Sequence, residues 1–247
     1  TFEETSYLLL FGELPTSKEL KEFSSLVAEF RKLPDELILI LKALPKETRP
    51  MDVLQMAVSS LGTFYDLEVS PEKVKSKKYE RDYFLNTSAA LIGALGSIVA
   101  AWHRIRNSQE HITSKADLSY AENFLHMLGA EKITPLMTRI MDATLVLHGE
   151  HTINASTFTA MVTSSTLANA SQVVASAIGS LSGPLHGGAN EKVVAMLQKI
   201  HSKDDIRPWL DETLKAKNVV WGMGHREYSV KDPRANILTD MVQELFD

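Results

Sequence analysis

Two histidines of this 247-residue sequence each lie in a segment bracketed by glycines. His186 belongs to GPLHGGAN over residues 183–190, and His225 follows Gly222 and Gly224. Glycine has no Cβ and permits positive φ, so a ligand can approach the backbone closely in such turns. Imidazole both donates hydrogen bonds and exchanges protons near neutral pH. The two segments therefore predict an active site that uses two histidines.

The residues after His186 predict a helix that begins immediately beyond it. Apolar side chains follow Ala189 at helical spacing, with Glu191 in the first turn and Ile200 near the end. The positive end of the helix dipole favours a neutral imidazole over an imidazolium. A neutral imidazole in that position is suited to donate a hydrogen bond to a developing oxyanion.

Further candidate polar groups lie in two short segments, HGEH at 148–151 and DPR at 232–234. His148 and His151 are three residues apart near the end of a predicted helix, so they can share a face. The planar guanidinium of Arg234 suits bidentate binding of a carboxylate. A surface ion pair of Arg234 with Asp232 or Asp240 is the alternative that such spacing more often produces.

Taken together, these segments resemble the signature of the citrate synthase family. The matching segments are GPLHGGAN, GMGHREYSVKDPRA at 222–235 and HGEHTINAST at 148–157, and the resemblance extends back to FEETSYLLLFGELP at 2–15. It implies that His186 and His225 are the catalytic histidines. It also implies that His151 and Arg234 bind an oxo-acid, with His148 supporting His151.

The resemblance implies a definite reaction. In the family, the methyl carbon of acetyl-CoA is joined to the ketone carbon of oxaloacetate, and the thioester is hydrolysed to release citrate and CoA. His186 would donate to the thioester oxygen while an aspartate removes the methyl proton, and His225 would polarise the ketone. No tightly bound cofactor is implied. The related 2-methylcitrate synthases use propionyl-CoA, and one methylene is discriminated by only about 1–3 kcal/mol, so the acyl group stays open.

The same resemblance assigns the CoA contacts to the backbone around residues 219–224. These contact residues are Val219, Val220, Gly222, Met223 and Gly224. Many relatives carry a basic residue four positions after the second catalytic histidine, where this chain has Ser229. Lys231 and Arg226 are nearby, so the cation that holds the CoA phosphates stays open.

The catalytic base of the family has no counterpart among these residues. Its aspartate and two further arginines lie well beyond the DPR segment, and the chain ends at Asp247. Asp232, Glu191 and Glu227 lie near the histidines in sequence but do not match the family position. Because the sequence also starts at Thr1 without a methionine, we expect it to be part of a longer polypeptide and to be inactive by itself.

Composition excludes several other classes of protein. A net charge of −5 argues against binding to a nucleic-acid backbone, and no phosphate-binding loop or dinucleotide fingerprint is present. The absence of cysteine fits a reducing compartment, and we expect the cytoplasm. The uncharged stretch 85–102 contains four polar residues, which favours a core or interface helix over a membrane span.

Two alternatives to a citrate synthase, a metal hydrolase and a non-catalytic module, remain open at this stage. HGEH with His186 or His225 could supply nitrogen ligands to zinc, but its spacing differs from that of HExxH metalloproteases, so no metal is expected. The other alternative is a helical assembly module without chemistry. Its candidate contact surfaces are the helices rich in alanine and serine at 88–102 and 155–180, which are also the expected interfaces of a homodimer or larger homo-oligomer.

The elements that must position these residues are predicted to be helices. Apolar periodicity and capping signals place them at 2–11, at 17–33 capped by Ser17, at 34–44, from 50 to about 58, at 83–105, from 117 capped by Asp117, at 135–148 and at 155–181. The segment 73–81 is expected to be a solvated basic loop, and 218–221 is the one strand-like stretch. We predict an all-α protein with a large helical domain at 1–181 and a smaller helical domain at 182–247, hinged at 180–188.

Overall fold

The computed structural model describes residues 1–70, 72, 76–224 and 229–246. Within these residues the chain forms twelve α-helices and one short 3-10 helix, with no strand, so the predicted all-α fold is confirmed. The strand-like stretch at 218–221 has no regular structure.

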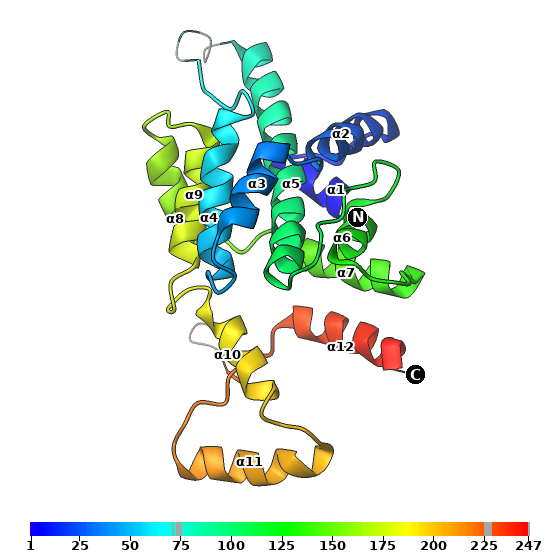
Figure 1. Cartoon of the computed structure of the whole chain (residues 1–247), viewed down its shortest axis with the longest axis vertical. Helices are drawn as coiled ribbons and strands as arrows, with labels where there is room; N and C mark the ends of the chain where they lie inside the picture. The colour runs from blue at the N-terminus through cyan, green and yellow to red at the C-terminus, as the bar shows by residue number, and fades with distance from the viewer. Residues whose placement is uncertain (71, 73–75, 225–228, 247) are drawn as a thin grey trace.

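The helices fall into two groups in space. The first nine form a bundle, whereas α10–α12 lie beyond its lower end in Figure 1. Their bounds are α1 Phe2–Phe11, α2 Ser17–Phe30, α3 Asp35–Ala43, α4 Pro50–Ser60, η1 Leu61–Thr63, α5 Lys77–Arg106, α6 Tyr120–Leu128, α7 Pro135–Leu147, α8 Ala155–Ser164, α9 Ala170–Leu181, α10 Gly188–Leu197, α11 Lys203–Lys215 and α12 Pro233–Phe246.

The bundle is built around α5. Its small side chains let neighbouring helices approach closely: a Cβ on Gly93 would lie 2.6 Å from the carbonyl oxygen of Val27 on α2. By length and composition α5 is the one helix in the described residues that could cross a membrane, yet Ala94, Ile98 and Trp102 are among its many residues buried in this chain's own core. Most of segment 88–102 therefore serves the core of the chain rather than a subunit surface.

Several helix boundaries differ from the sequence prediction because a neighbouring residue provides the cap. Thr16, not Ser17, caps α2, since Glu19 lies three residues on and completes a capping box. Ser119, not Asp117, caps α6 by accepting a hydrogen bond from the Glu122 amide. Ser76 caps α5, so residues 77–81 of the expected basic loop are helical; residues 73–75 lie outside the described part.

The predicted helix at 155–181 is two helices. Residues 165–169 form a turn in which Leu167 has a φ of 59°, and Asn169 caps α9 through the Ser171 amide. The chain then reverses, so α8 and α9 pack along each other, with Thr163 and Ser176 joined through their hydroxyls at 2.9 Å. The alternation of alanine with serine and threonine conceals this reversal, because these residues fit both helices and turns.

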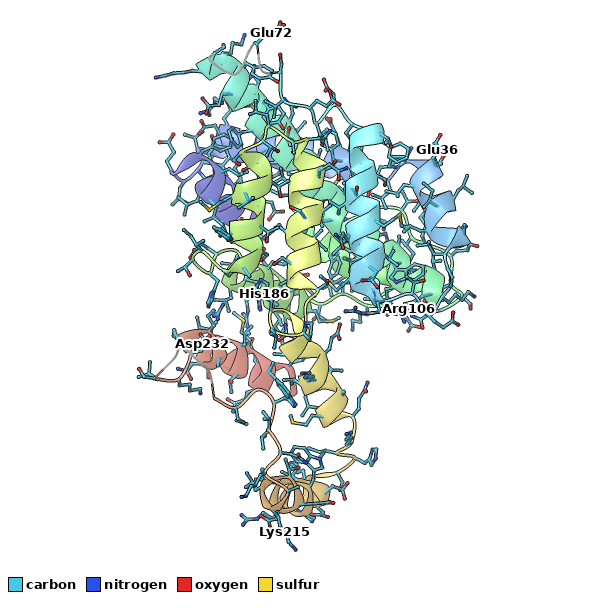
Figure 2. All side chains as sticks on the ribbon, turned by 90° about the vertical axis from the view of Figure 1, so that its left-hand side faces the viewer. Glu36, Glu72, Arg106, His186, Lys215 and Asp232 are labelled. Carbon is cyan, nitrogen blue, oxygen red and sulfur yellow. The ribbon has the colours of Figure 1, made fainter. Side chains whose placement is uncertain are left out.

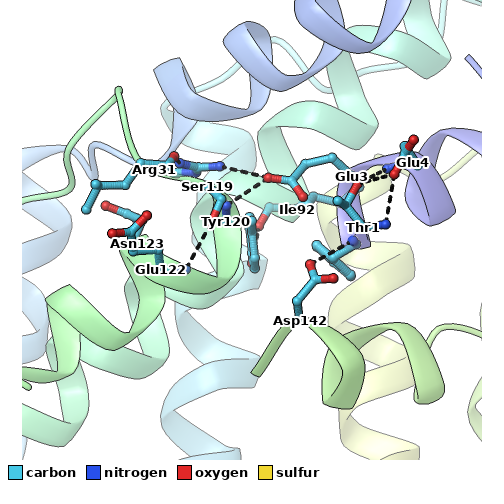
Figure 3. Close-up of polar contacts among 12 residues, drawn as sticks. Thr1, Glu3, Glu4, Arg31, Ile92, Ser119, Tyr120, Glu122, Asn123 and Asp142 are labelled. Carbon is cyan, nitrogen blue, oxygen red and sulfur yellow. Dashed lines mark hydrogen bonds and ion pairs between the residues drawn. The ribbon is translucent and has the colours of Figure 1, made fainter. Parts of the chain in front are cut away.

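A buried polar cluster ties the N-terminus to the bundle. Glu3 accepts a hydrogen bond from the Tyr120 amide at 2.8 Å and lies 3.9 Å from the Arg31 guanidinium, and both side chains are buried (Figure 3). Arg31 also donates to the Leu118 carbonyl at 2.8 Å and lies over the Tyr120 ring. Burial raises the pKa of Tyr120 to about 12, so this phenol stays neutral and donates to the Ile92 carbonyl.

Helix α12 connects the lower group to the bundle by packing against α7, with an ion pair between Arg139 and Glu244. The lower group begins immediately after α9. This arrangement is compatible with the predicted boundary between residues 181 and 182, which stays a proposal.

Candidate active site

His186 lies in the turn between α9 and α10, two residues before α10 begins, as the sequence predicts. The turn is closed by hydrogen bonds from the His186 amide to the Gly183 carbonyl and from the Gly187 amide to the Leu181 carbonyl, both 3.0 Å long. A Cβ on Gly187 would lie 2.3 Å from the Leu181 carbonyl oxygen, which is a backbone atom that cannot move aside cheaply. Gly187 is therefore required by a close backbone approach.

The His186 ring reaches the start of α8. Its Nε2 lies 2.9 Å from the Ser156 hydroxyl and accepts a hydrogen bond from the Ser156 amide at 3.3 Å. An amide can only donate, so this contact requires Nε2 to be without a proton and places the hydrogen of a neutral ring on Nδ1. Within the described residues Nδ1 has no protein partner, so the ring presents a donor to a ligand.

This arrangement gives a sharp test of the turn. Gly187→Ala is expected to displace the turn at a cost of about 1–3 kcal/mol, because the methyl group must be accommodated against backbone. Gly188→Ala is the matched control, since its Cβ would meet nothing closer than Pro184 at 3.7 Å. Thermal unfolding and the two-dimensional NMR signal of the His186 ring should change in the first variant and stay close to wild type in the second. Equal behaviour of the two variants would contradict the assignment.

Arg234 lies in the first turn of α12 and forms the ion pair with Asp232 that the sequence left as an alternative. Its Nη2 is 2.7 Å from Asp232 Oδ2, and its Nε is 3.1 Å from both carboxylate oxygens. Nη1 donates to the Leu147 carbonyl at the end of α7 at 3.3 Å. The guanidinium thus connects α12 to the end of α7 and is fixed in orientation.

The ion pair has a measurable acid titration. The hydrogen bonds from Arg234 hold the pKa of Asp232 at about 2, below its ordinary value of 3.8. Because the pKa is lower in the folded chain, the pair stabilises the fold above pH ~4, and that contribution is lost as the pH falls towards ~2. Carboxyl NMR should give a midpoint near 2 for Asp232 in the wild type and a higher one in Arg234→Gln. A midpoint near 3.8 in the wild type would show that the pair does not form in solution.

His148 and His151 do not share a helix face, contrary to the prediction. His148 is the C-cap of α7, and its Nδ1 donates to the Thr144 carbonyl at 2.6 Å. His151 lies in the following loop, before Thr152 with a φ of 55°. The helix ends at His148, so the three-residue spacing no longer implies a common face. His151 is close enough to Asp232 for its charge to contribute to lowering the carboxyl pKa, after the larger effect of Arg234.

Three of the predicted residues are connected to the loop between α7 and α8. Arg234 binds its first end at Leu147, His186 binds its far end at Ser156, and His151 lies within it. Figure 2 shows His186 and Asp232 at the junction between the bundle and the lower group of helices. Ser156 has no predicted role of its own, although it lies inside the matched segment 148–157.

The second glycine-rich segment is described in part. His225 lies outside the described residues, as do Arg226 and Glu227. Gly222 and Gly224 have φ values of 86° and 80°, so the predicted left-handed backbone is confirmed at both positions. Val219 and Met223 are exposed, and Val220 is half-buried. Neighbouring Trp221 lies under the Lys192 ammonium, 4.2 Å from the ring centroid. The predicted CoA contacts are thus on an accessible surface with positive charge nearby.

Within the described residues, no group of three histidine, aspartate or glutamate side chains lies close enough together to hold a metal ion. His148 contacts the Thr144 carbonyl, and His151 contributes through its charge to the lowered pKa of Asp232. The arrangement instead combines a neutral hydrogen-bond donor, a fixed guanidinium and an exposed glycine-rich backbone. Such a set can orient a small dicarboxylate and stabilise negative charge on a carbonyl oxygen.

Comparison with known proteins identifies the family of the chain. The family model for the citrate synthase C-terminal domain matches residues 1–247. A citrate synthase of Synechocystis is 42% identical over 246 residues, which are 100% of this chain and 60% of the relative. A 2-methylcitrate synthase of Shewanella oneidensis is 37% identical, covering 99% of this chain and 63% of the relative. The chain belongs to the citrate synthase family.

A solved structure supports the fold and the family. Citrate synthase from Thermoplasma acidophilum, in a ternary complex with carboxymethyl coenzyme A and oxaloacetate, superposes with a TM-score of 0.84 at 29% identity. The match covers 99% of this chain and 62% of that chain. The chain therefore spans somewhat less than two thirds of the length of these relatives.

Proposed function

We propose that this chain carries most of the active site of a citrate synthase, an acyltransferase that condenses acetyl-CoA with oxaloacetate and water to give citrate and CoA. The observation that carries the proposal is the His186 ring. It is held through Nε2 by the start of α8 and presents Nδ1–H beside the loop to which Arg234 is anchored. A neutral donor fixed in this way stabilises an enolate oxygen without reorganising during the reaction.

In the proposed mechanism each substrate has its own polar group. His186 donates to the thioester oxygen of acetyl-CoA as the methyl proton is removed. His225 polarises the ketone of oxaloacetate and protonates the alkoxide that forms. The resemblance assigns the base to an aspartate that has no match among residues 1–247, so turnover is measured in a polypeptide that carries this aspartate. Val219 to Gly224 would present backbone groups to the CoA adenine.

Oxaloacetate recognition is assigned to Arg234 and His151, with His148 holding the loop in place. Oxaloacetate is a dianion, and Arg234 is the fixed cation at this loop. Asp232 occupies the Nε and Nη2 edge of the guanidinium, so a substrate carboxylate must compete with Asp232 for these donors.

Calorimetric titration with oxaloacetate tests this assignment. Arg234→Gln is expected to weaken binding by about tenfold to a hundredfold, since hydrogen bonds to charged groups contribute about 1.5–3 kcal/mol. His151→Ala should weaken binding as well, by removing a donor in the same loop. Arg207→Gln on α11 is the control, because its exposed side chain pairs with Asp211 on the same helix. Unchanged binding in both site variants, or no binding heat in the wild type, would point to a non-catalytic scaffold.

The alternative acyl substrate is propionyl-CoA, as used by 2-methylcitrate synthases. The higher identity to the Synechocystis citrate synthase favours acetyl-CoA. The discrimination depends on an apolar pocket for one methylene, worth about 1–3 kcal/mol.

We also propose that the protein functions as a homodimer or a larger homo-oligomer in the cytoplasm. The segment at 155–180 supports the assembly, because α8 has no buried residue and exposes Phe158, Met161 and Val162. Apolar side chains gathered on one helix are typical of a subunit contact. Small residues beside them allow close helix packing.

A further inference from the structure

A cleft of about 560 Å³ lies in the lower group of helices, between α10, α11 and the segment that follows α11 (Figure 1). Its volume is within the range of about 300–1,000 Å³ that is usual for ligand pockets. Val219 and Trp221 line it, and both lie in the segment 219–224 to which the CoA contacts are assigned. The cleft therefore borders the surface that the proposed function gives to CoA.

Lys192 of α10 is held at this cleft by an aromatic ring. Its ammonium nitrogen lies 4.2 Å from the centroid of the Trp221 ring, and Trp221 directly precedes Gly222 with its φ of 86°. Trp221 is half-buried and Lys192 is exposed, so a ligand can reach the ammonium. The attraction between the cation and the indole face restricts the long side chain, which reduces the conformational entropy lost when a ligand binds.

The ammonium of Lys192 keeps donors for a ligand. Within the described residues neither Lys192 nor Lys199 forms an ion pair. Lys199 follows seven residues later on the same face of α10 and also lines the cleft, where Glu212 contributes a negative charge. An ammonium has three N–H donors and no acceptor, so it suits a phosphate oxygen.

The sequence leaves open which cation binds the CoA phosphates, because Ser229 occupies the position where many relatives carry a basic residue. We propose that Lys192 supplies this charge. Its ammonium, held over Trp221, binds a phosphate group at the adenosine end of CoA while the adenine meets the backbone of 219–224. Lys199 lies further along the cleft and adds to the attraction. This inference rests on the proposed function, which brings CoA to this segment.

Calorimetric titration of the catalytically competent polypeptide with CoA, at a salt concentration of about 0.15 M, tests the proposal. Lys192→Met keeps an apolar stem on Trp221 but removes the charge, and it should weaken CoA binding about fivefold to tenfold. Lys192→Arg should restore most of the affinity, since a guanidinium also stacks on aromatic faces and binds phosphate. Lys203→Met is the matched control, because this lysine of α11 is exposed and lies outside the cleft lining.

Titration with 3′-dephospho-CoA identifies the phosphate group that Lys192 binds. If Lys192 binds the 3′-phosphate, Lys192→Met should weaken the binding of CoA but not that of 3′-dephospho-CoA. If Lys192 binds the diphosphate, the substitution should weaken the binding of both ligands equally. Either result supports the proposal, and unchanged affinity for both ligands would overturn it.

Steady-state kinetics provides a second readout. KM for acetyl-CoA should rise in Lys192→Met, whereas kcat and KM for oxaloacetate should stay unchanged, because Lys192 is assigned to neither the thioester nor the oxo-acid. If the wild type turns over and Lys192→Met binds CoA as tightly, or if Lys203→Met loses as much affinity, this inference fails and the proposed function stands. A wild type that neither binds CoA nor forms citrate would overturn both.

Discussion

His186→Ala is expected to lower kcat for citrate formation by about 10²–10³-fold, which corresponds to about 2.7–4 kcal/mol of lost transition-state stabilisation. The imidazole is already fixed by Ser156, so its Nδ1–H is aimed before the reaction begins. A water molecule that replaces the ring has no such orientation. KM for oxaloacetate should change little, because His186 is assigned to the other substrate.

Steady-state CoA release with acetyl-CoA and propionyl-CoA in parallel measures this effect in the catalytically competent polypeptide. Acetyl-CoA should be the better substrate of the wild type, and His186→Ala should lower the rates with both. His201→Ala is the control, since that histidine is exposed and follows α10. A loss in kcat of less than about threefold in His186→Ala would show that His186 does not act in the chemical step. Removal of one oxyanion donor normally lowers kcat by at least about 10²-fold.

Glu3→Ala is expected to destabilise the fold by about 3–5 kcal/mol, which is the cost of breaking a buried ion pair by removing one partner. The substitution leaves the buried Arg31 guanidinium without its carboxylate and the Tyr120 amide without its acceptor. Because α1 is held to α6 by this carboxylate, we expect the N-terminal helix to detach first.

Chemical denaturation followed by circular dichroism gives the free energy of unfolding of each variant. Glu22→Ala is the matched control, because its side chain is 66% exposed and its pair with Lys18 lies on the surface. Glu3→Gln retains the acceptor for the Tyr120 amide but not the charge. Its free energy of unfolding should therefore lie between those of Glu3→Ala and the wild type. If Glu3→Ala were as stable as Glu22→Ala, the buried pair would not contribute to the fold.

Much of the fold follows from local sequence signals. The capping box at Thr1 and the proline at the start of α4 are short-range features, and both helices begin where these residues predict. The reversal at 165–169 is not visible in the sequence, because serine, threonine and alanine are compatible with helix and turn alike. The sequence pattern predicts the cap of α6 two residues early for a similar reason, since Asp117 and Ser119 are both good capping residues.

The candidate site was predicted in part. The turn that carries His186 and the positive φ of Gly222 and Gly224 follow from the glycine pattern. The contact between His186 and Ser156 joins residues 30 positions apart, and no local pattern indicates it. The same holds for the anchoring of Arg234 to Leu147, 87 residues away, which depends on α12 packing against α7. Tertiary packing, rather than spacing, brings these groups together.

We propose that the rings of His186 and His225 converge on two carbonyl oxygens. A crystal structure of the catalytically competent protein with oxaloacetate and carboxymethyl coenzyme A measures this directly. We expect His186 Nδ1 about 2.7–3.1 Å from the oxygen that mimics the thioester carbonyl, and a His225 nitrogen at a similar distance from the ketone oxygen. Rings that lie far apart, or that are packed in the protein with no ligand between them, would contradict the account.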